Sequence, residues 1–232
     1  MKFPNIKAVL TKVGRSVPPK AIHYLSGVLN YLAVGRWFRD RGLDIPSRVQ
    51  GRAALYQLIS PAIKQPTVYL EFGVFEGEAM RRWLSVLSHE GNRFHGFDSF
   101  EGLPENWTLL CDKKVFDLEG RMPTFNDSRV TLHKGWFSDT IPPFIADFQT
   151  PEQLVVHLDA DLYSSTILPL RALRPHFRVG TVLIFDEFFD REHEMKAFSE
   201  FLSDENLEIE CLGGTAALTQ VAFRITKIAE SK

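Results

Sequence analysis

The sequence lacks long hydrophobic runs and has few cysteines. The first absence argues against a membrane-spanning protein, and the second argues against a disulfide-bonded one. No run of about eighteen apolar residues occurs among the 232 positions, and the first residues contain neither an apolar signal-peptide core nor a cleavage site. Only two cysteines are present, Cys111 and Cys211, and their separation fits neither a metal site nor a redox pair. We therefore expect a cytoplasmic protein without stable membrane insertion, whose cysteines are ordinary thiols.

A broad excess of positive charge is also missing. Lys and Arg number 27 against 29 Asp and Glu, which gives a formal net charge of −2 and argues against nucleic acid as a partner. The beginning of the chain is the exception, because several basic residues precede the first acid: Lys2, Lys7, Lys12, Arg15 and Lys20. Interleaved with apolar residues, they predict an amphipathic helix. We favour a basic arm or lid packed on the domain over a membrane contact.

Two common nucleotide-binding fingerprints are absent as well. The chain has neither the G-x-G-x-x-G of dinucleotide enzymes nor the Gly-Lys-Ser/Thr of a P-loop. It has instead an apolar strand that runs into an acidic, glycine-containing turn formed by Glu71, Gly73, Val74 and Gly77. The glycines let the backbone approach a ligand closely, and the following helix presents free N–H groups there. This turn predicts the first ligand crevice of an open α/β sheet.

Apolar strands and helical segments alternate beyond the first fifty residues, as in a parallel sheet covered on both faces. We expect seven strands, over residues 67–73, 93–98, 129–134, 154–159, 181–186, 207–212 and 218–225. We expect helices over residues 21–38, 48–63, 77–90, 166–177 and 192–203. Only four residues, 213–216, separate the last two strands, so these should be antiparallel. The prediction is a Rossmann-like α/β domain over residues 51–232, preceded by a helical extension or lid over residues 1–50.

One long irregular stretch, residues 101–127, interrupts this alternation. Trp107, Phe116 and Phe125 give it apolar anchors. A loop of this length in a compact domain is commonly functional. We expect an ordered cap over the substrate rather than a disordered segment.

A carboxylate ends the second predicted strand and suggests a cofactor site. Asp98, followed by Ser99, is well placed to accept hydrogen bonds from both hydroxyls of a ribose, although an Asp-Ser pair is also good turn chemistry. Gly135 and Trp136 follow the third strand. The indole of Trp136 would stack on an adenine ring, unless it serves only as a core anchor.

Three carboxylates follow the fourth and fifth predicted strands, namely Asp159, Asp186 and Glu187. Neighbouring strand ends would bring them together, and three oxygen donors are what Mg²⁺ requires. Without a cation, they would repel one another and raise one another's pKa. The alternative is that they cap helices or pair with Arg171, Arg174 or Arg191. Asp161 is either a further ligand or the cap of the next helix.

A bound divalent ion would favour the alkoxide of a substrate hydroxyl, and a base must take the proton. His193 follows the fifth strand closely enough to reach such a site, so we predict His193 and Asp159 as catalytic residues. Asp159 would also border the cofactor. Other candidate bases are His133, His157 and His176.

With these residues assembled, the chain resembles the macrocin O-methyltransferase group, also called TylF-like, of the class I S-adenosylmethionine-dependent methyltransferases. The resemblance rests on five stretches in the family's order: residues 71–74, 97–104, 135–140, 158–166 and 186–187. It implies S-adenosylmethionine at Glu71, Gly73 and Asp98, and Mg²⁺ at Asp159, Asp186 and Glu187. It also implies a hydroxyl of a sugar, glycan or natural product as the acceptor and, by analogy, a homodimer built partly from the N-terminal segment.

The chain departs from the sugar-modifying members of that group in two places. It has Asp186-Glu187 where they usually carry Asp-Asp, and it has no convincing counterpart of their N-terminal substrate lid. Glutamate is still an oxygen donor, so metal binding survives the first change. The identity of the acceptor does not carry over.

Three other functions compete with this interpretation. The Asp159-x-Asp161 element resembles the metal site of nucleotide-sugar glycosyltransferases, but that assignment leaves residues 71–77 and 97–104 unexplained. A dehydrogenase would need the tighter glycine fingerprint and a Tyr-x-x-x-Lys motif, which are absent. A non-catalytic scaffold of the same fold would have no need for the clustered acids. We therefore expect a metal-assisted O-methyltransferase.

Overall fold

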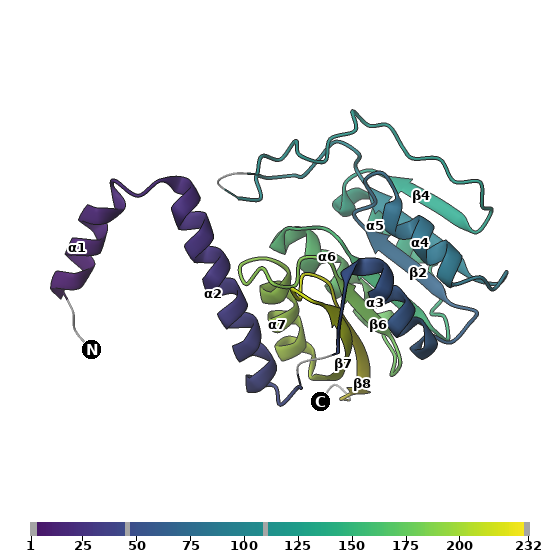
Figure 1. The fold of residues 1–232 in the computed structure, drawn as a ribbon. Helices are drawn as coiled ribbons and strands as arrows, with labels where there is room; N and C mark the ends of the chain where they lie inside the picture. The colour runs from purple at the N-terminus through teal and green to yellow at the C-terminus, as the bar shows by residue number, and fades with distance from the viewer. Residues whose placement is uncertain (1–3, 45–46, 109–110, 230–232) are drawn as a thin grey trace.

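The computed structural model describes residues 4–44, 47–108 and 111–229 and contains one mixed sheet of eight strands (Figure 1). The strands lie in the order β1-β7-β8-β6-β5-β2-β3-β4. Strand β8 is antiparallel to β6 and β7, and all the other neighbours are parallel. The strands are β1 (Arg48–Val49), β2 (Val68–Phe72), β3 (Arg93–Asp98), β4 (Val130–Lys134), β5 (Leu154–Leu158), β6 (Val182–Phe185), β7 (Leu207–Thr215) and β8 (Val221–Ile228).

Helices cover both faces of the sheet. The described helices are α1 (Pro4–Gly14), α2 (Pro19–Asp40), α3 (Gly51–Ile59), α4 (Glu78–Val86), α5 (Phe137–Asp147), α6 (Tyr163–Leu173) and α7 (Glu194–Glu205), with short 3₁₀ turns at Ser60–Ala62 and Arg174–His176. One core contains side chains of α2, α5, α6 and α7, and the other contains side chains of α3 and α4. Strand residues alternate between them, so in β2 Leu70 and Phe72 face the first core and Tyr69 faces the second.

The Rossmann-like α/β class and the antiparallel end of the sheet are confirmed, and three details of the prediction are wrong. The sheet has an eighth strand, because Arg48–Val49 pairs with β7. The helix that was expected to start at residue 48 begins instead at Gly51, whose φ is +75°. Helix α5 was not predicted, and it contains Pro142 and Pro143, which disfavour a helix interior. It forms nevertheless, because Ile141 is buried and neighbouring apolar side chains pack on the first core.

The end of α2 belongs to the domain core. Trp37 lies within 5.0–6.0 Å of the rings of Phe188, Phe198 and Phe223, and its Nε1–H donates to Ser199 Oγ at 2.6 Å. Phe38 is also buried there. The physical domain therefore begins within α2 and not at residue 51.

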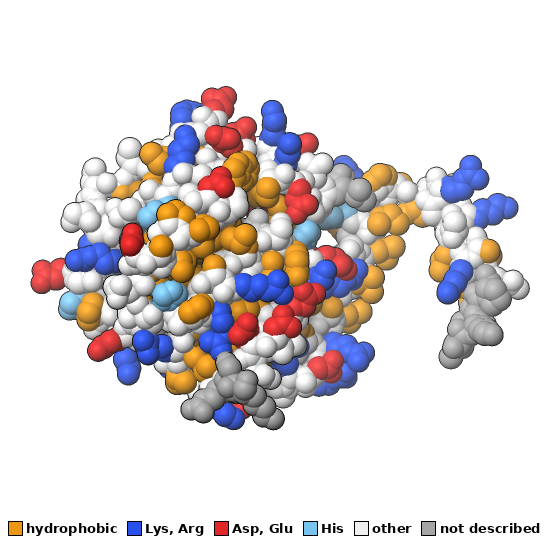
Figure 2. Space-filling model, turned by 180° about the vertical axis from the view of Figure 1, so that it is seen from behind, with side chains coloured by type: hydrophobic (Ala, Val, Ile, Leu, Met, Phe, Trp, Pro, Cys, Tyr) orange, Lys and Arg blue, Asp and Glu red, His pale blue; other side chains and the backbone are white. Residues whose placement is uncertain are grey.

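The N-terminal arm, which we define as residues 4–33, extends away from that domain (Figures 1 and 2). Every side chain from residue 5 to residue 16 is exposed. Helix α1 therefore does not pack on the domain as a lid. No helix in the three described ranges is long and apolar enough to cross a membrane.

Candidate active site

A cavity of about 530 Å³ lies at the carboxyl-terminal ends of the parallel strands. Its walls come from the loops after β2, β3, β4, β5 and β6, with Arg52 from α3. The strand order reverses between β2 and β5, which is where ligands bind in open α/β sheets. Most of the predicted site residues line it: Gly73, Val74, Asp98, Ser99, Gly135, Trp136, Asp159, Asp186 and Glu187.

At one end of the cavity the carboxylate of Asp98 is held by backbone donors. Its Oδ2 accepts hydrogen bonds from the N–H groups of Val74 and Phe75 at 2.7 and 2.8 Å, and its Oδ1 accepts one from Phe100 N–H at 2.7 Å. Asp98 thus fixes the loop after β2 as well as its own turn. A carboxylate offers about four lone-pair positions, so one acceptor position remains for a ligand.

Gly73 joins this end of the cavity to the other. Its φ is +92°, and a Cβ at this position would lie 1.8 Å from the carbonyl oxygen of Asp159. Only glycine allows this approach of the β2 loop to the β5 loop. The sequence predicts that glycine here lets the backbone approach a ligand. The structure adds a second requirement, because the same backbone lies against the end of the neighbouring strand.

Aromatic side chains line the part of the cavity near residues 101–127. Phe75 contacts Phe116 with ring centroids 5.4 Å apart, and Trp107 lies 6.5 Å from Phe116. All three line the cavity, as does Trp136, which is 36% exposed. The described part of the long loop therefore forms part of the cavity wall, and its role as a cap over the substrate stays a prediction.

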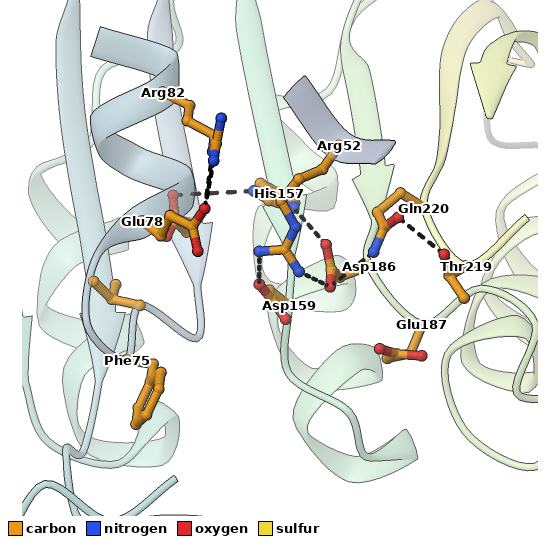
Figure 3. Close-up of polar contacts among 12 residues, drawn as sticks. Arg52, Phe75, Glu78, Arg82, His157, Asp159, Asp186, Glu187, Thr219 and Gln220 are labelled. Carbon is orange, nitrogen blue, oxygen red and sulfur yellow. Dashed lines mark hydrogen bonds and ion pairs between the residues drawn. The ribbon is translucent and has the colours of Figure 1, made fainter. Parts of the chain in front are cut away.

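At the other end of the cavity, Arg52 is placed between two carboxylates (Figure 3). Its Nη2 lies 2.7 Å from Asp186 Oδ2, and its Nη1 lies 3.9 Å from Asp159 Oδ2. Gln220 Nε2–H donates to the same Asp186 oxygen at 3.2 Å. Asp186 is 3% exposed and Arg52 is 32% exposed, so the guanidinium forms the solvent-facing side of the pair.

The acids at this end outnumber the positive charges that face them. Burial, together with Asp186 and other acids, raises the pKa of Asp161 to about 7 and that of Glu187 to about 8. Burial also raises the pKa of Asp159. Burial opposes ionisation of Asp186 too, but His157 and Arg52 outweigh it and lower the pKa of that carboxyl. We call Asp159, Asp161, Asp186, Glu187 and Glu194 the acidic cluster.

A buried polar network lies directly behind the acidic cluster. The Tyr69 hydroxyl is 2.5 Å from Glu71 Oε2 and 2.8 Å from His157 Nδ1. His157 Nε2 lies 3.7 Å from Asp186 Oδ1, and neither atom has a hydrogen-bond partner among the described residues. His157, Asp159 and Asp186 offer ligand atoms within 4.8 Å of one another.

Comparison with known proteins agrees with this geometry. Residues 70–188, just over half of the chain, match the family model described as a methyltransferase domain. The chain belongs to this family. The matched stretch of the methyltransferase domain runs from β2 to the residues just after β6, so it contains both ends of the cavity. The narrower resemblance to the macrocin group stays a prediction.

A curated relative is the 8-demethyl-8-(2,3-dimethoxy-alpha-L-rhamnosyl)-tetracenomycin-C 4'-O-methyltransferase of Streptomyces olivaceus. It is 30% identical over 146 residues, an alignment that covers 53% of each chain, so the match spans about half the length of that relative.

Similar solved structures include the O-methyltransferase NovP (24% identity, TM-score 0.54, 75% of this chain and 78% of that one). The calicheamicin methyltransferase CalS11 matches with 24% identity and a TM-score of 0.53 over 74% and 76% of the two chains. A Bacillus cereus O-methyltransferase in complex with SAH matches with 17% identity and a TM-score of 0.51, over 95% and 97%. These likenesses show the shared fold.

Three predicted site residues of the methyltransferase domain lie outside the cavity walls. Glu71 is fully buried in the network behind the acidic cluster, where burial raises its pKa to about 8. Gly77 precedes α4, and a Cβ there would meet Phe125 at 2.5 Å. His193 Nδ1 accepts a hydrogen bond from Tyr163 N–H at 3.2 Å, at the start of α6.

The main cavity residue that the sequence did not suggest is Arg52. The arginines considered as partners of the acidic cluster bind elsewhere, since Arg171 pairs with Asp204, Arg174 with Glu205 and Arg191 with Glu192. Arg52 lies 134 positions from Asp186, and only the folded arrangement of α3 and β6 brings them together.

The acidic cluster suits a divalent cation on chemical grounds. Within the described part of the chain, Asp186 Oδ1 and His157 Nε2 are buried without partners, and Asp159 and Glu187 add oxygen donors at the cavity wall. Glu187 is not in the compact group formed by His157, Asp159 and Asp186 within the described residues. The carboxylate oxygens suit Mg²⁺ or Mn²⁺, whereas an imidazole nitrogen is more typical of sites for transition metals such as zinc or iron.

Proposed function

We propose that this methyltransferase domain transfers a methyl group from S-adenosylmethionine to a hydroxyl of a sugar, glycan or natural product, with help from a divalent metal. The observation that carries the proposal is a single cavity with two unlike ends, the donor-bound Asp98 at one and the acidic cluster at the other. The named relatives support the acceptor class, because one is named as the 4'-O-methyltransferase of a rhamnosyl-tetracenomycin and another as an O-methyltransferase.

The Asp98 end would bind the methyl donor. Asp98 would accept a hydrogen bond from the ribose, the Gly73–Val74 backbone would lie against the amino-acid part, and Ser99, Gly135 and Trp136 would border the adenine. Among the proteins of similar fold, cmcI-D160 is described with Mg-SAM and the Bacillus cereus O-methyltransferase with SAH, which is consistent with this use of the fold. Glu71 and Gly77 would act on the loop from behind rather than touch the donor.

The acidic cluster would receive the acceptor. Asp159, Asp186 and Glu187 would hold the divalent ion, with His157 as a further ligand, and the ion would lower the pKa of a bound hydroxyl. Ser164 and Ser165 stand on the same wall, and Ser164 Oγ–H donates to Glu105 at 2.9 Å. The aromatic wall beside them suits the apolar face of a sugar ring.

In the proposed reaction the acceptor oxygen attacks the sulfonium methyl carbon. A C–O bond forms, the C–S bond breaks, and its electron pair stays on sulfur to give S-adenosylhomocysteine. The hydroxyl proton must leave to a base in the cavity. Asp159 lines the cavity and His193 does not, so we assign proton transfer to the carboxylates and not to His193. The chain contributes mainly by positioning the two substrates.

Titration calorimetry tests the proposal without knowing the acceptor. We expect micromolar binding of S-adenosylhomocysteine, a separate signal for Mg²⁺ or Mn²⁺, and no binding of UDP. Binding of UDP that depends on metal, with no response to S-adenosylhomocysteine, would replace the proposal by the glycosyltransferase alternative.

A further inference from the structure

The N-terminal arm exposes an unusual amount of apolar side chain. Of the 17 large hydrophobic side chains exposed in the described residues, 11 lie in α1 and α2: Ile6, Val9, Leu10, Val13, Ile22, Tyr24, Leu25, Val28, Leu29, Tyr31 and Leu32. An apolar surface of this kind, gathered on two helices, marks an interaction site. Figure 2 shows orange side chains along the helix that leaves the domain.

The exposed residues form continuous stripes. In α1, Ile6, Val9, Leu10 and Val13 follow the i, i+3, i+4, i+7 spacing of one helix face, and Lys7 and Lys12 stand on either side of it. In α2, the exposed residues occupy roughly half of the helix circumference at 100° per residue. The face of α2 that packs on the domain is a different one, which carries Val34, Trp37 and Phe38.

The charge on this segment has one sign. The arm, residues 4–33, contains four of the 27 Lys and Arg residues, Lys7, Lys12, Arg15 and Lys20, and none of the 29 Asp and Glu residues, so it carries a formal charge of +4 and the remainder carries −6. A basic helix with an apolar stripe binds at the surface of anionic lipid, where the lysines meet headgroups and the stripe enters the boundary of the acyl chains.

A second copy of the chain offers a poorer match to the arm. Two arms that meet face to face would bring together positive charges with no carboxylate between them. The domain, in its described part, contributes six of the 17 exposed large hydrophobic residues, against 11 on the two helices, and these six come from separate segments: Leu58, Phe75, Val115, Met122, Trp136 and Val179.

We propose that the N-terminal arm binds the surface of an anionic membrane. Tyr31 stacks on Phe189 with ring centroids 5.7 Å apart, and Phe189 is two residues beyond Glu187 of the acidic cluster. The arm therefore leaves the domain at the loop after β6, which supplies Asp186 and Glu187 to the acceptor end of the cavity, and α2 projects past the neighbouring end of α7 (Figure 1). Adsorption through the arm holds that end of the cavity near the lipid surface.

Vesicle co-sedimentation of the full chain tests this proposal. We expect binding to phosphatidylcholine vesicles that contain phosphatidylglycerol, and little binding to phosphatidylcholine alone. Leu10→Asp with Leu25→Asp, or Lys7→Glu with Lys12→Glu, should weaken binding by about tenfold or more. Val179→Asp and Lys64→Glu are matched controls on the domain, and neither should weaken it. Binding of the Lys7→Glu, Lys12→Glu variant should also be less sensitive to salt.

Two results would overturn the proposal. One is equal sedimentation of the wild-type chain with neutral and anionic vesicles, or none with either. The other is a dimer, measured by sedimentation equilibrium, that Leu25→Asp dissociates while vesicle binding is absent, since the arm would then serve a second copy. Binding of S-adenosylhomocysteine at the wild-type level confirms that each variant is folded. If the wild-type chain itself does not bind S-adenosylhomocysteine, the proposed function fails but the proposal for the arm does not.

Discussion

The two ends of the cavity place carboxylates in opposite situations. Asp98 accepts three backbone hydrogen bonds, so its charge is satisfied by the fold itself. At the other end several acids face the guanidinium of Arg52, and buried oxygens of Asp186 and Glu194 have no partner in the described ranges. At the first end the backbone supplies most of the partners of the carboxylate. The second is completed by what binds there, which is the pattern expected when one end positions a cofactor and the other activates a substrate.

The largest expected effect is on the acidic cluster. Asp186→Asn removes the charge that holds Arg52 and the proposed ion, so metal binding should be lost and the methyl-transfer rate should fall about a thousandfold or more. Binding of S-adenosylhomocysteine should change little, because Asp98 is untouched. Calorimetry with the metal and with the thioether separates the two results. Full metal affinity in this variant would show that Asp186 is not a ligand.

Asp98→Ala should weaken binding of the thioether and leave metal binding nearly unchanged. It removes a charged acceptor for the ribose and frees the N–H groups of Val74 and Phe75, so affinity for S-adenosylhomocysteine should fall about 10- to 100-fold. Metal affinity should stay within about threefold of the wild type, as additivity predicts for separate sites. Asp98→Asn keeps the shape and serves as the milder control. A loss of metal affinity equal to the loss of thioether affinity would mean that the two ends are not independent.

Arg52→Gln should change the metal affinity less than Asp186→Asn does, and it should raise that affinity rather than lower it. The guanidinium is a positive charge within 4 Å of Asp159 and Asp186, so its removal should strengthen Mn²⁺ binding by about tenfold. Binding is measured by electron paramagnetic resonance without substrate. Arg52→Lys keeps the charge and should remain near the wild type. Weaker Mn²⁺ binding in the Gln variant would show that Arg52 supports the metal site and does not compete for it.

The smallest expected effect is on the pH dependence of the stability of the metal-free chain. The pKa of Glu187 is raised to about 8 in the folded state, above its value of about 4.3 in an unfolded chain. The folded state therefore binds more protons between these limits, and the free energy of unfolding should rise as pH falls from about 8 toward 6. After solvent screening the gain is about 1 kcal/mol, or 2–4 °C in Tm.

Glu187→Gln tests the origin of that pH dependence. The substitution removes the titrating group, so Tm in the presence of a chelator should vary less between pH 8 and pH 6 than it does for the wild type. Asp98→Asn, at the satisfied end of the cavity, is the control and should leave the variation unchanged. Identical pH profiles for Glu187→Gln and the wild type would assign the effect to other groups.

The positions of the carboxylates could be predicted from the sequence, because they follow from the ends of the predicted strands; the backbone hydrogen bonds to Asp98 could not. Carboxylates at strand ends share one edge of a parallel sheet, so Asp98, Asp159 and Asp186 could be placed together before the fold was known. Arg52 could not, since it reaches the cluster from α3 through a contact 134 positions apart. His193 has the chemistry of a base, but its Nδ1 accepts a hydrogen bond at the start of α6 and its side chain does not line the cavity. Helix α5 forms although its two prolines have low helix propensity, because burial of Ile141 stabilises it in the fold.

The aromatic packing around Trp37 has a consequence for how this protein can be shortened. The family match begins at residue 70, and helical sequence before residue 51 looks like a removable extension. A chain truncated at residue 51 would lose Trp37 and Phe38, and would leave Phe188, Phe198 and Phe223 uncovered beside the acidic cluster. A truncation that keeps residue 30 onward preserves that packing. The unit that shares one hydrophobic core is therefore longer than the unit that sequence comparison recognises.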